Sequence, residues 1–242
     1  MAIEAGRTIK DLAVENPEST RVFEALGIDY CCGGKRPVEE ACAHAGISVD
    51  ELQARIEAVI KDSASRNDRD KNWASRSISD LVNHVVTTHH AYVRNEIPRI
   101  TALLEKIGAK HGERHPELFE VKSVFAGLAA ELTVHMMKEE QVLFPYLVRM
   151  EEAVLESEPA PPAMFGSIEH PIHMMMFEHD SAGVALGQLK ELTGGYIAPS
   201  DGCTTYAAAY RALAEFEADL HQHIHLENNI LFPRAIEMSR EG

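Results

Sequence analysis

The sequence predicts an all-α protein whose C-terminal part is an up-down-up-down four-helix bundle, preceded by a small helical domain. Beyond residue 73 the apolar residues recur with helical spacing, and there is no convincing strand alternation. Three short breaks rich in glycine or proline interrupt this pattern, and helices joined by short connections pack antiparallel. The long helices are expected at residues 77–107, 116–150, 168–193 and 203–238.

A polar stretch divides the chain into two expected domains. Residues 61–72 (KDSASRNDRDKN) contain almost no apolar side chains and are typical of a linker. The small domain therefore covers residues 1–62 and the bundle domain residues 73–242. Within the small domain, Gly27 and Gly46 each suit the position directly after a helix.

Composition excludes several classes of function. The formal net charge of −15 argues against nucleic acid, because a phosphate backbone would be repelled. We see no signal peptide and no apolar run of the roughly 18 residues that a membrane span needs. Four cysteines are too few for a disulfide framework in 242 residues, so a cytoplasmic protein is expected. Thirteen histidines are unusually many.

A histidine–glutamate motif occurs twice in the bundle domain. Residues 135–145 and 223–233 both read H-x3-E-x4-F-P. Residues four apart lie on one face of a helix, so each motif presents an imidazole beside a carboxylate. One such pair could be a surface ion pair, but the repetition favours a shared site. The paired residues are His135 with Glu139 and His223 with Glu227.

Two more histidines lie at the same level of the predicted bundle. In an antiparallel hairpin, residues equidistant from the turn face each other. The midpoint of His90 and His135 falls in the first break, that of His135 and His179 in the second, and that of His179 and His223 in the third. Four imidazoles and two carboxylates are therefore expected to converge.

This ligand set favours two metal ions. Imidazole and carboxylate without thiolate suit iron, manganese or zinc, and structural zinc needs only four ligands. Six ligands give two histidines to each of two metals, with Glu139 and Glu227 bridging. A bridging oxygen would leave each metal an exchangeable position, which fits redox-active iron better than zinc.

The segments HMMKEEQVLFP, FEHD and HIHLENNILFP resemble hemerythrin-like domains, and DYCCGGK resembles the N-terminal domain of iron–sulfur cluster repair di-iron proteins of the Ric or ScdA type. The match runs from about Thr8 to Ala235. The resemblance implies two non-haem irons per chain, oxo-bridged and glutamate-bridged. The ligands it implies are His90, His135, Glu139, His179, His223 and Glu227.

Two details depend on this resemblance. His89 and His90 are adjacent, and only one can face the bundle axis; the family's spacing to a following proline, here Pro98, favours His90. Oxygen-carrying hemerythrins have a further histidine one turn after the third-helix ligand, whereas this chain has Gly183. The glycine is expected to leave space beside the metal.

Other residues near the predicted site are candidates for a functional role, but each can also be an ordinary surface residue. Glu131 and Glu178 lie next to ligands, and each is expected to act as a base that contacts a ligand, to line a path to solvent, or to be an ordinary surface carboxylate. His111 and His115, in the first break, are expected to be solvated.

The vicinal cysteines Cys31 and Cys32 are strained if joined to each other, so a structural disulfide between them is not expected. Between two helices and before two glycines, they can be exposed and reactive, and we assign them iron transfer or client contact; buried packing is the alternative. Cys42 and Cys203 are expected to be ordinary residues.

The implied function is the repair of iron–sulfur clusters damaged by nitric oxide or oxidants, by supplying iron to client iron–sulfur proteins. One alternative is an enzyme that reduces nitric oxide or peroxide at the di-iron site. A second is a module that senses or stores oxygen or nitric oxide. Nucleic acid and membranes are not expected partners, whereas a second copy of the chain is a candidate.

Overall fold

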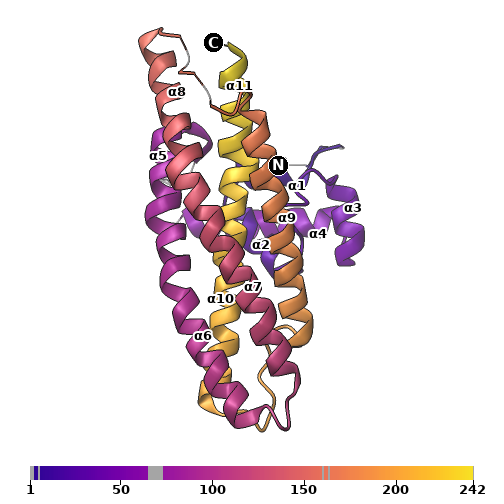
Figure 1. Cartoon of the computed structure of the whole chain (residues 1–242). Coiled ribbons are helices and arrows are strands. Elements are labelled where there is room, and N and C mark those ends of the chain that lie inside the picture. The colour runs from indigo at the N-terminus through magenta and orange to yellow at the C-terminus, as the bar shows by residue number, and fades with distance from the viewer. Residues whose placement is uncertain (1–2, 5, 65–72, 160, 163, 242) are drawn as a thin grey trace.

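The computed structural model describes residues 3–4, 6–64, 73–159, 161–162 and 164–241, and in this part of the chain helices form an elongated antiparallel bundle with a small helical unit beside it (Figure 1). This confirms the predicted fold class. The first bundle helix consists of α5 (Ile78–His84), η3 (Val85–His90) and α6 (Ala91–His111), and the second of α7 (Glu117–Lys138), η4 (Glu139–Leu143) and α8 (Phe144–Glu156). The third is α9 (Glu169–Leu192), and the fourth consists of α10 (Thr204–His225), η5 (Leu226–Leu231) and α11 (Phe232–Glu241).

The first two bundle helices run past their predicted C-terminal ends, and the first break begins only after His111. Glu151, expected in the second break, instead lies within α8. Its carboxylate accepts hydrogen bonds from the backbone N–H groups of Ile78 and Ser79, at 2.6 and 2.9 Å. Helix N-termini present unpaired N–H groups that a carboxylate satisfies, so this contact fixes the start of the first bundle helix on the second.

Three of the four bundle helices contain a π-helical segment, namely η3, η4 and η5. In η4 and η5 the widened turn is visible in the backbone. The N–H of Phe144 bonds to the carbonyl of Glu139, and that of Phe232 to the carbonyl of Glu227, each five residues back. A proline follows each phenylalanine, and a proline inside a helix crowds the carbonyl four residues earlier. The widened turn relieves this crowding and lies at the candidate site.

The N-terminal unit consists of short helices whose ends follow the sequence signals. Gly27 and Gly46 adopt the left-handed conformation after α2 and α3, with φ of 65° and 70°, as predicted. The predicted linker at residues 61–72 lies largely outside the described residues, since α4 continues to Ala64. The elements of the N-terminal unit are α1 (Ile9–Glu15), α2 (Ser19–Leu26), α3 (Val38–Ala45) and α4 (Val49–Ala64), and η2 (Trp73–Ser75) precedes the first bundle helix.

The N-terminal unit packs directly on the bundle, and buried residues of both belong to one hydrophobic core. Tyr30 is the anchor: its side chain is 1% exposed and its ring packs edge-on against His225, with centroids 5.4 Å apart. Gln222 donates a hydrogen bond to the Tyr30 hydroxyl at 2.8 Å. Asn229, in η5, donates to the Tyr30 carbonyl at 2.9 Å. The loop after α2 is therefore held against the fourth bundle helix.

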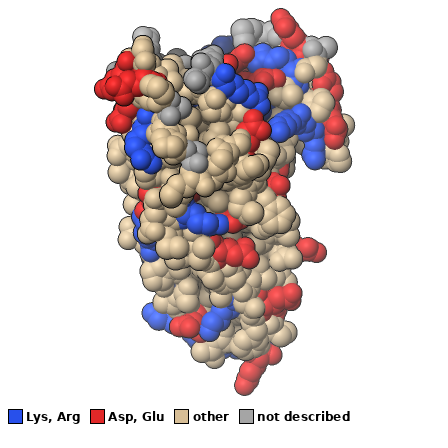
Figure 2. Space-filling view, turned by 45° about the horizontal axis from the view of Figure 1, so that its top comes forward, with Lys and Arg blue, Asp and Glu red and all other residues tan. Residues whose placement is uncertain are grey.

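On the face drawn in Figure 2, lysine and arginine side chains lie among aspartate and glutamate side chains. Within the described ranges, none of the helices combines the length and apolar character that crossing a membrane requires.

Gly34 tests how closely the loop after α2 approaches the rest of the protein. A Cβ there would lie 2.7 Å from the carbonyl oxygen of Tyr30 and 3.2 Å from Cβ of Lys10. We expect Gly34→Ala to lower the free energy of unfolding in urea by about 1–3 kcal/mol, as overpacking does. Gly127→Ala is the control, because its Cβ would meet no atom within 4 Å in a helix, and it should instead raise stability by about 1 kcal/mol. Equal effects of the two substitutions would show that the loop yields freely.

Candidate metal centre

The centre of the bundle holds two groups of four buried ligand atoms. One consists of His90, Glu139, His223 and Glu227, and the other of His135, Glu139, His179 and Glu227. Within each group the ligand atoms all lie within 4.8 Å of one another. The structure thus brings together the six residues selected from the sequence, one histidine from each bundle helix and one glutamate from each motif.

The two carboxylates lie between the two imidazole pairs. One oxygen of Glu139 is 3.3 Å from Nε2 of His90 and the other 3.3 Å from Nε2 of His135. Glu227 faces His179 at 3.1 Å and His223 at 3.0 Å, again with different oxygens. Each carboxylate therefore presents one oxygen to each pair, which is the arrangement of a ligand that bridges two metals.

The donor set fits cations bound at this position. Glu139 and Glu227 are both 0% exposed. Both oxygens of Glu139 and Oε2 of Glu227 receive no well-formed hydrogen bond from the described residues. Burying a carboxylate without such partners is costly, and a bound cation removes that cost.

The pKa values of the buried carboxylates and of His135 also show that positive charge is stabilised at this position. Burial, the largest influence, opposes ionisation, yet the facing imidazoles hold the pKa of Glu139 below its ordinary value and that of Glu227 well below it. Burial also lowers the pKa of His135, but Glu139, Glu227 and Glu178 outweigh it and raise that pKa to about 9. Protons and metal cations compete for such imidazoles, so cation binding here releases protons.

The first copy of the motif, in the second bundle helix, also holds the histidine of the first bundle helix. Glu140, directly after Glu139, accepts a hydrogen bond from Nδ1 of His90 at 2.6 Å and pairs with Arg94. The motif phenylalanine Phe144 stacks on the His90 ring, with centroids 5.8 Å apart and planes 17° apart. These contacts fix the ring so that its Nε2 points at the carboxylates.

The fourth helix repeats these contacts on the third. Asn228, directly after Glu227, accepts a hydrogen bond from Nδ1 of His179 at 2.8 Å. Phe232 stacks on the His179 ring, with centroids 6.0 Å apart and planes 8° apart. Sequence reasoning missed the roles of these neighbours, although their equal offsets in the two motifs carried the signal.

The two acidic residues that were candidates beside the ligands, Glu178 and Glu131, make different contacts. Glu178 accepts a hydrogen bond from Nδ1 of His135 at 2.8 Å and also contacts Lys138. Glu131 is exposed and lines a cavity of about 490 Å³ that also reaches His135 and His179. Glu178 thus orients a candidate ligand, whereas Glu131 lines the cavity beside two of them.

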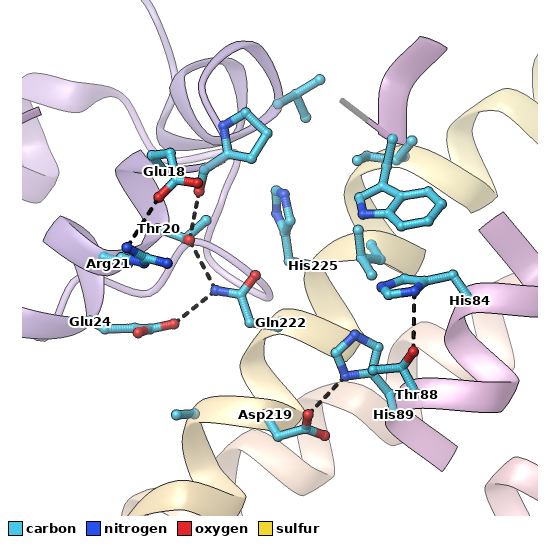
Figure 3. Close-up of a pocket in the computed structure, with 16 residues that line it drawn as sticks. Glu18, Thr20, Arg21, Glu24, His84, Thr88, His89, Asp219, Gln222 and His225 are labelled. Atoms are coloured by element: carbon cyan, nitrogen blue, oxygen red, sulfur yellow. Dashed lines mark hydrogen bonds and ion pairs between the residues drawn. The ribbon is translucent and has the colours of Figure 1, made fainter. Parts of the chain in front are cut away.

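A second cavity, of about 440 Å³, is lined by residues of α2 and of the first and fourth bundle helices (Figure 3). His89 lines it and points its Nδ1 at Asp219, 3.0 Å away. Its ring stacks on that of His223, with centroids 5.6 Å and planes 9° apart. His90, not His89, therefore faces the carboxylates, while His89 separates His223 from the cavity.

The cysteine loop is docked beside the centre, which corrects the expectation of exposure. Cys31 is buried, with 4% exposed, and Cys32 is half-buried. The pKa of Cys31 is raised well above that of a free thiol by its hydrogen bond with the Cys32 sulfur, by burial and by the nearby Asp29 carboxylate. Cys31 is therefore a protonated thiol in this arrangement rather than a low-pKa nucleophile.

The loop also occupies the space expected beside Gly183. Sγ of Cys32 lies 3.8 Å from the backbone carbonyl of His179 and 3.8 Å from where a Cβ of Gly183 would lie. Asn228 donates a hydrogen bond to the Cys31 carbonyl at 3.3 Å. The glycine thus faces a thiol of the N-terminal unit.

Family models match both parts of the chain. Residues 81–235 match the Hemerythrin HHE cation binding domain. Residues 5–60 match the ScdA_N domain, a domain of unknown function.

Relatives match over nearly the whole chain. A probable iron-sulfur cluster repair protein of Haemophilus influenzae is 35% identical over 232 residues, which is 96% of this chain and 97% of that protein. The iron-sulfur cluster repair protein YtfE of Pectobacterium carotovorum is 32% identical, with 95% and 96% covered. The protein of that name from Yersinia pseudotuberculosis is 33% identical, with 93% and 94% covered.

Asn228 tests whether the residues around the histidines tune cation binding. We expect Asn228→Ala to weaken cation affinity, measured by competition with a chelator, by about 10- to 100-fold, because His179 loses its acceptor. Asn228→Asp keeps an acceptor oxygen and should lose much less. Asn83→Ala, at an exposed asparagine of α5, is the control. An unchanged affinity in Asn228→Ala would show that His179 is oriented by packing alone.

Proposed function

This chain belongs to the hemerythrin-like family of iron–sulfur cluster repair proteins, and from that premise we propose that it restores iron–sulfur clusters damaged by nitric oxide or oxidants by supplying iron. The observation that supports this most is the pair of buried carboxylates shared between two imidazole pairs, with a two-cysteine loop docked beside them. We propose that the centre holds two irons. Their ligands would be His90, His135, Glu139, His179, His223 and Glu227.

In this proposal the protein residues have distinct tasks. Glu139 and Glu227 hold the two metal positions together, and the imidazoles complete each position. Glu140, Glu178 and Asn228 orient three of the rings by hydrogen bonds at Nδ1. Bound iron supplies redox chemistry and exchangeable coordination, which carboxylate and imidazole ligands support.

The cysteine loop would act after it leaves its docked position. Cys32 is the outward thiol, whereas Cys31 is buried and protonated while the loop is docked. Undocking would expose both sulfurs and remove the burial that contributes to the raised pKa of Cys31. The two thiolates could then contact iron or a client protein transiently.

Two other functions are not favoured. Reduction of nitric oxide or peroxide, and sensing or storage of a gas, use the bundle alone and give no task to the docked loop. We propose iron–sulfur proteins as clients and the cytoplasm as the compartment, since the four cysteines are unpaired.

Iron content tests the proposed centre. The purified chain should contain close to two irons and show oxo-bridge absorption in the near ultraviolet when oxidised. His90→Ala should lose iron because its Nε2 faces Glu139, whereas His89→Ala, with its Nδ1 turned to Asp219, should retain nearly all of it. Stoichiometric zinc after expression in iron-replete medium would contradict the proposal, as would iron loss in His89→Ala but not in His90→Ala.

Reactivation of a client tests the cysteine loop. The double variant Cys31→Ser/Cys32→Ser should keep its iron content and spectrum, because the six proposed ligands all lie in the bundle. It should nevertheless fail to reactivate a nitric-oxide-damaged iron–sulfur enzyme in vitro. Cys203→Ala, at the far end of the bundle, is the matched control and should reactivate the client normally. If the double variant repairs the client as well as the unaltered chain, the loop has no role in delivery.

A further inference from the structure

A third thiol, Cys203, lies far from the metal centre at the end of the bundle where α6 meets α10 (Figure 1). It is the N-cap residue of α10, with extended backbone. His223 is on the same helix, 20 residues later, which corresponds to about 30 Å along the axis. Chemistry at Cys203 is therefore separate from the proposed iron centre.

His111, at the C-terminal end of α6, is directed at this sulfur. Its Nε2 lies 3.3 Å from Sγ of Cys203. The imidazole is 5% exposed, which corrects the expectation that it is solvated, and its Nδ1 has no partner in the described part of the chain. Tyr206 packs edge-on against the ring, with centroids 5.4 Å apart. A buried imidazole that faces a thiol through Nε2 resembles the partner of an activated nucleophile.

The start of α10 adds a second stabilising influence on a thiolate. Cys203 caps α10, which is 22 residues long, and the backbone amides of Thr205 and Tyr206 in its first turn help to lower the pKa of the thiol. Helix N-termini stabilise anions.

The surrounding charges agree with a thiolate. The His111 hydrogen bond is the largest influence that lowers the pKa of Cys203 to about 7, followed by the helix amides, and Lys110 lowers it further. Asp201 also lies at this end, but it is paired with His115 at 3.1 Å. By contrast, burial raises the pKa of Cys42.

We propose that Cys203 and His111 form a thiol-modification site that exchanges with low-molecular-weight disulfides. The Cys203 thiolate attacks one sulfur of the disulfide, a new sulfur–sulfur bond forms, and the original bond breaks. The departing thiolate takes up the proton that Cys203 gave to Nε2 of His111. The disulfide is the oxidant, and one half of it leaves as a reduced thiol.

Geometry and reactivity both favour this class of electrophile. Cys203 is half-buried rather than enclosed, so a small disulfide can reach it. A thiol whose pKa lies near the ambient pH attacks disulfides best, because much of it is ionised while its nucleophilicity is retained. The positive charge of Lys110, which helps to lower the pKa of the thiol, favours a disulfide that carries carboxylates.

The experiment uses the full iron-loaded chain and oxidised glutathione. Each cysteine is alkylated over a range of pH and quantified by mass spectrometry, and glutathione adducts are then mapped at pH 7. We expect Cys203 labelling to have a midpoint near pH 7, so that about half is thiolate there, compared with about 3% for an ordinary thiol. Cys203 should also be the first cysteine to form the mixed disulfide, with the iron content unchanged.

Two histidine variants provide the matched comparison. His111→Gln should raise the labelling midpoint by about one pH unit or more and slow adduct formation several-fold at pH 7. His115→Gln, in the adjacent turn, should leave the midpoint nearly unchanged. A Cys203 midpoint of 8.5 or higher in the unaltered chain would overturn the proposal even if His111→Gln failed to fold. So would adducts that form first at Cys32, or a midpoint that does not respond to His111→Gln.

Discussion

Two carboxylates buried side by side in an apolar bundle are the constraint on which the rest of this structure depends. Glu139 and Glu227 are fully buried, and unpaired charges in such a place would cost several kcal/mol each. Four imidazoles, one from each bundle helix, face them. The bundle can bury these carboxylates only if all four helices keep their relative height, so the lengths of the connections and the helix register are tied to the centre.

The repeated motif explains how that register is maintained. Each copy supplies a histidine and a glutamate to the centre. The residue directly after the glutamate and the phenylalanine of the motif contact the histidine of the preceding helix and hold its ring in place. Glu140 and Phe144 hold His90, and Asn228 and Phe232 hold His179. The proline that ends each copy follows a π-helical segment, which lies at the level of the centre. In both halves of the bundle, equivalent motif residues therefore orient the histidine of the preceding helix by the same two contacts.

Much of this could be predicted because it is periodic. Helical spacing predicted the bundle, the repeat identified Glu139 and Glu227, and the midpoints of the breaks placed the four histidines at one level. The π-helical turns could not be predicted in this way, because a pattern of 3.6 residues per turn has no place for an extra residue. The burial of Cys31 and the pairing of His111 with Cys203 arise from contacts between distant segments, which spacing within one helix does not contain.

The side chain of Asn228 couples the N-terminal loop to the centre. The carbonyl oxygen of Asn228 accepts a hydrogen bond from His179, and its amide nitrogen donates one to the carbonyl of Cys31. Because both bonds belong to one planar amide, a shift of the loop changes the orientation of the acceptor that holds His179. Gly183 lies against this loop, since the Cys32 sulfur is 3.8 Å from the position that a Cβ of Gly183 would take. Coupling of this kind is reciprocal, so a change at His179 alters the docking of the cysteines by the same free energy with which docking alters His179.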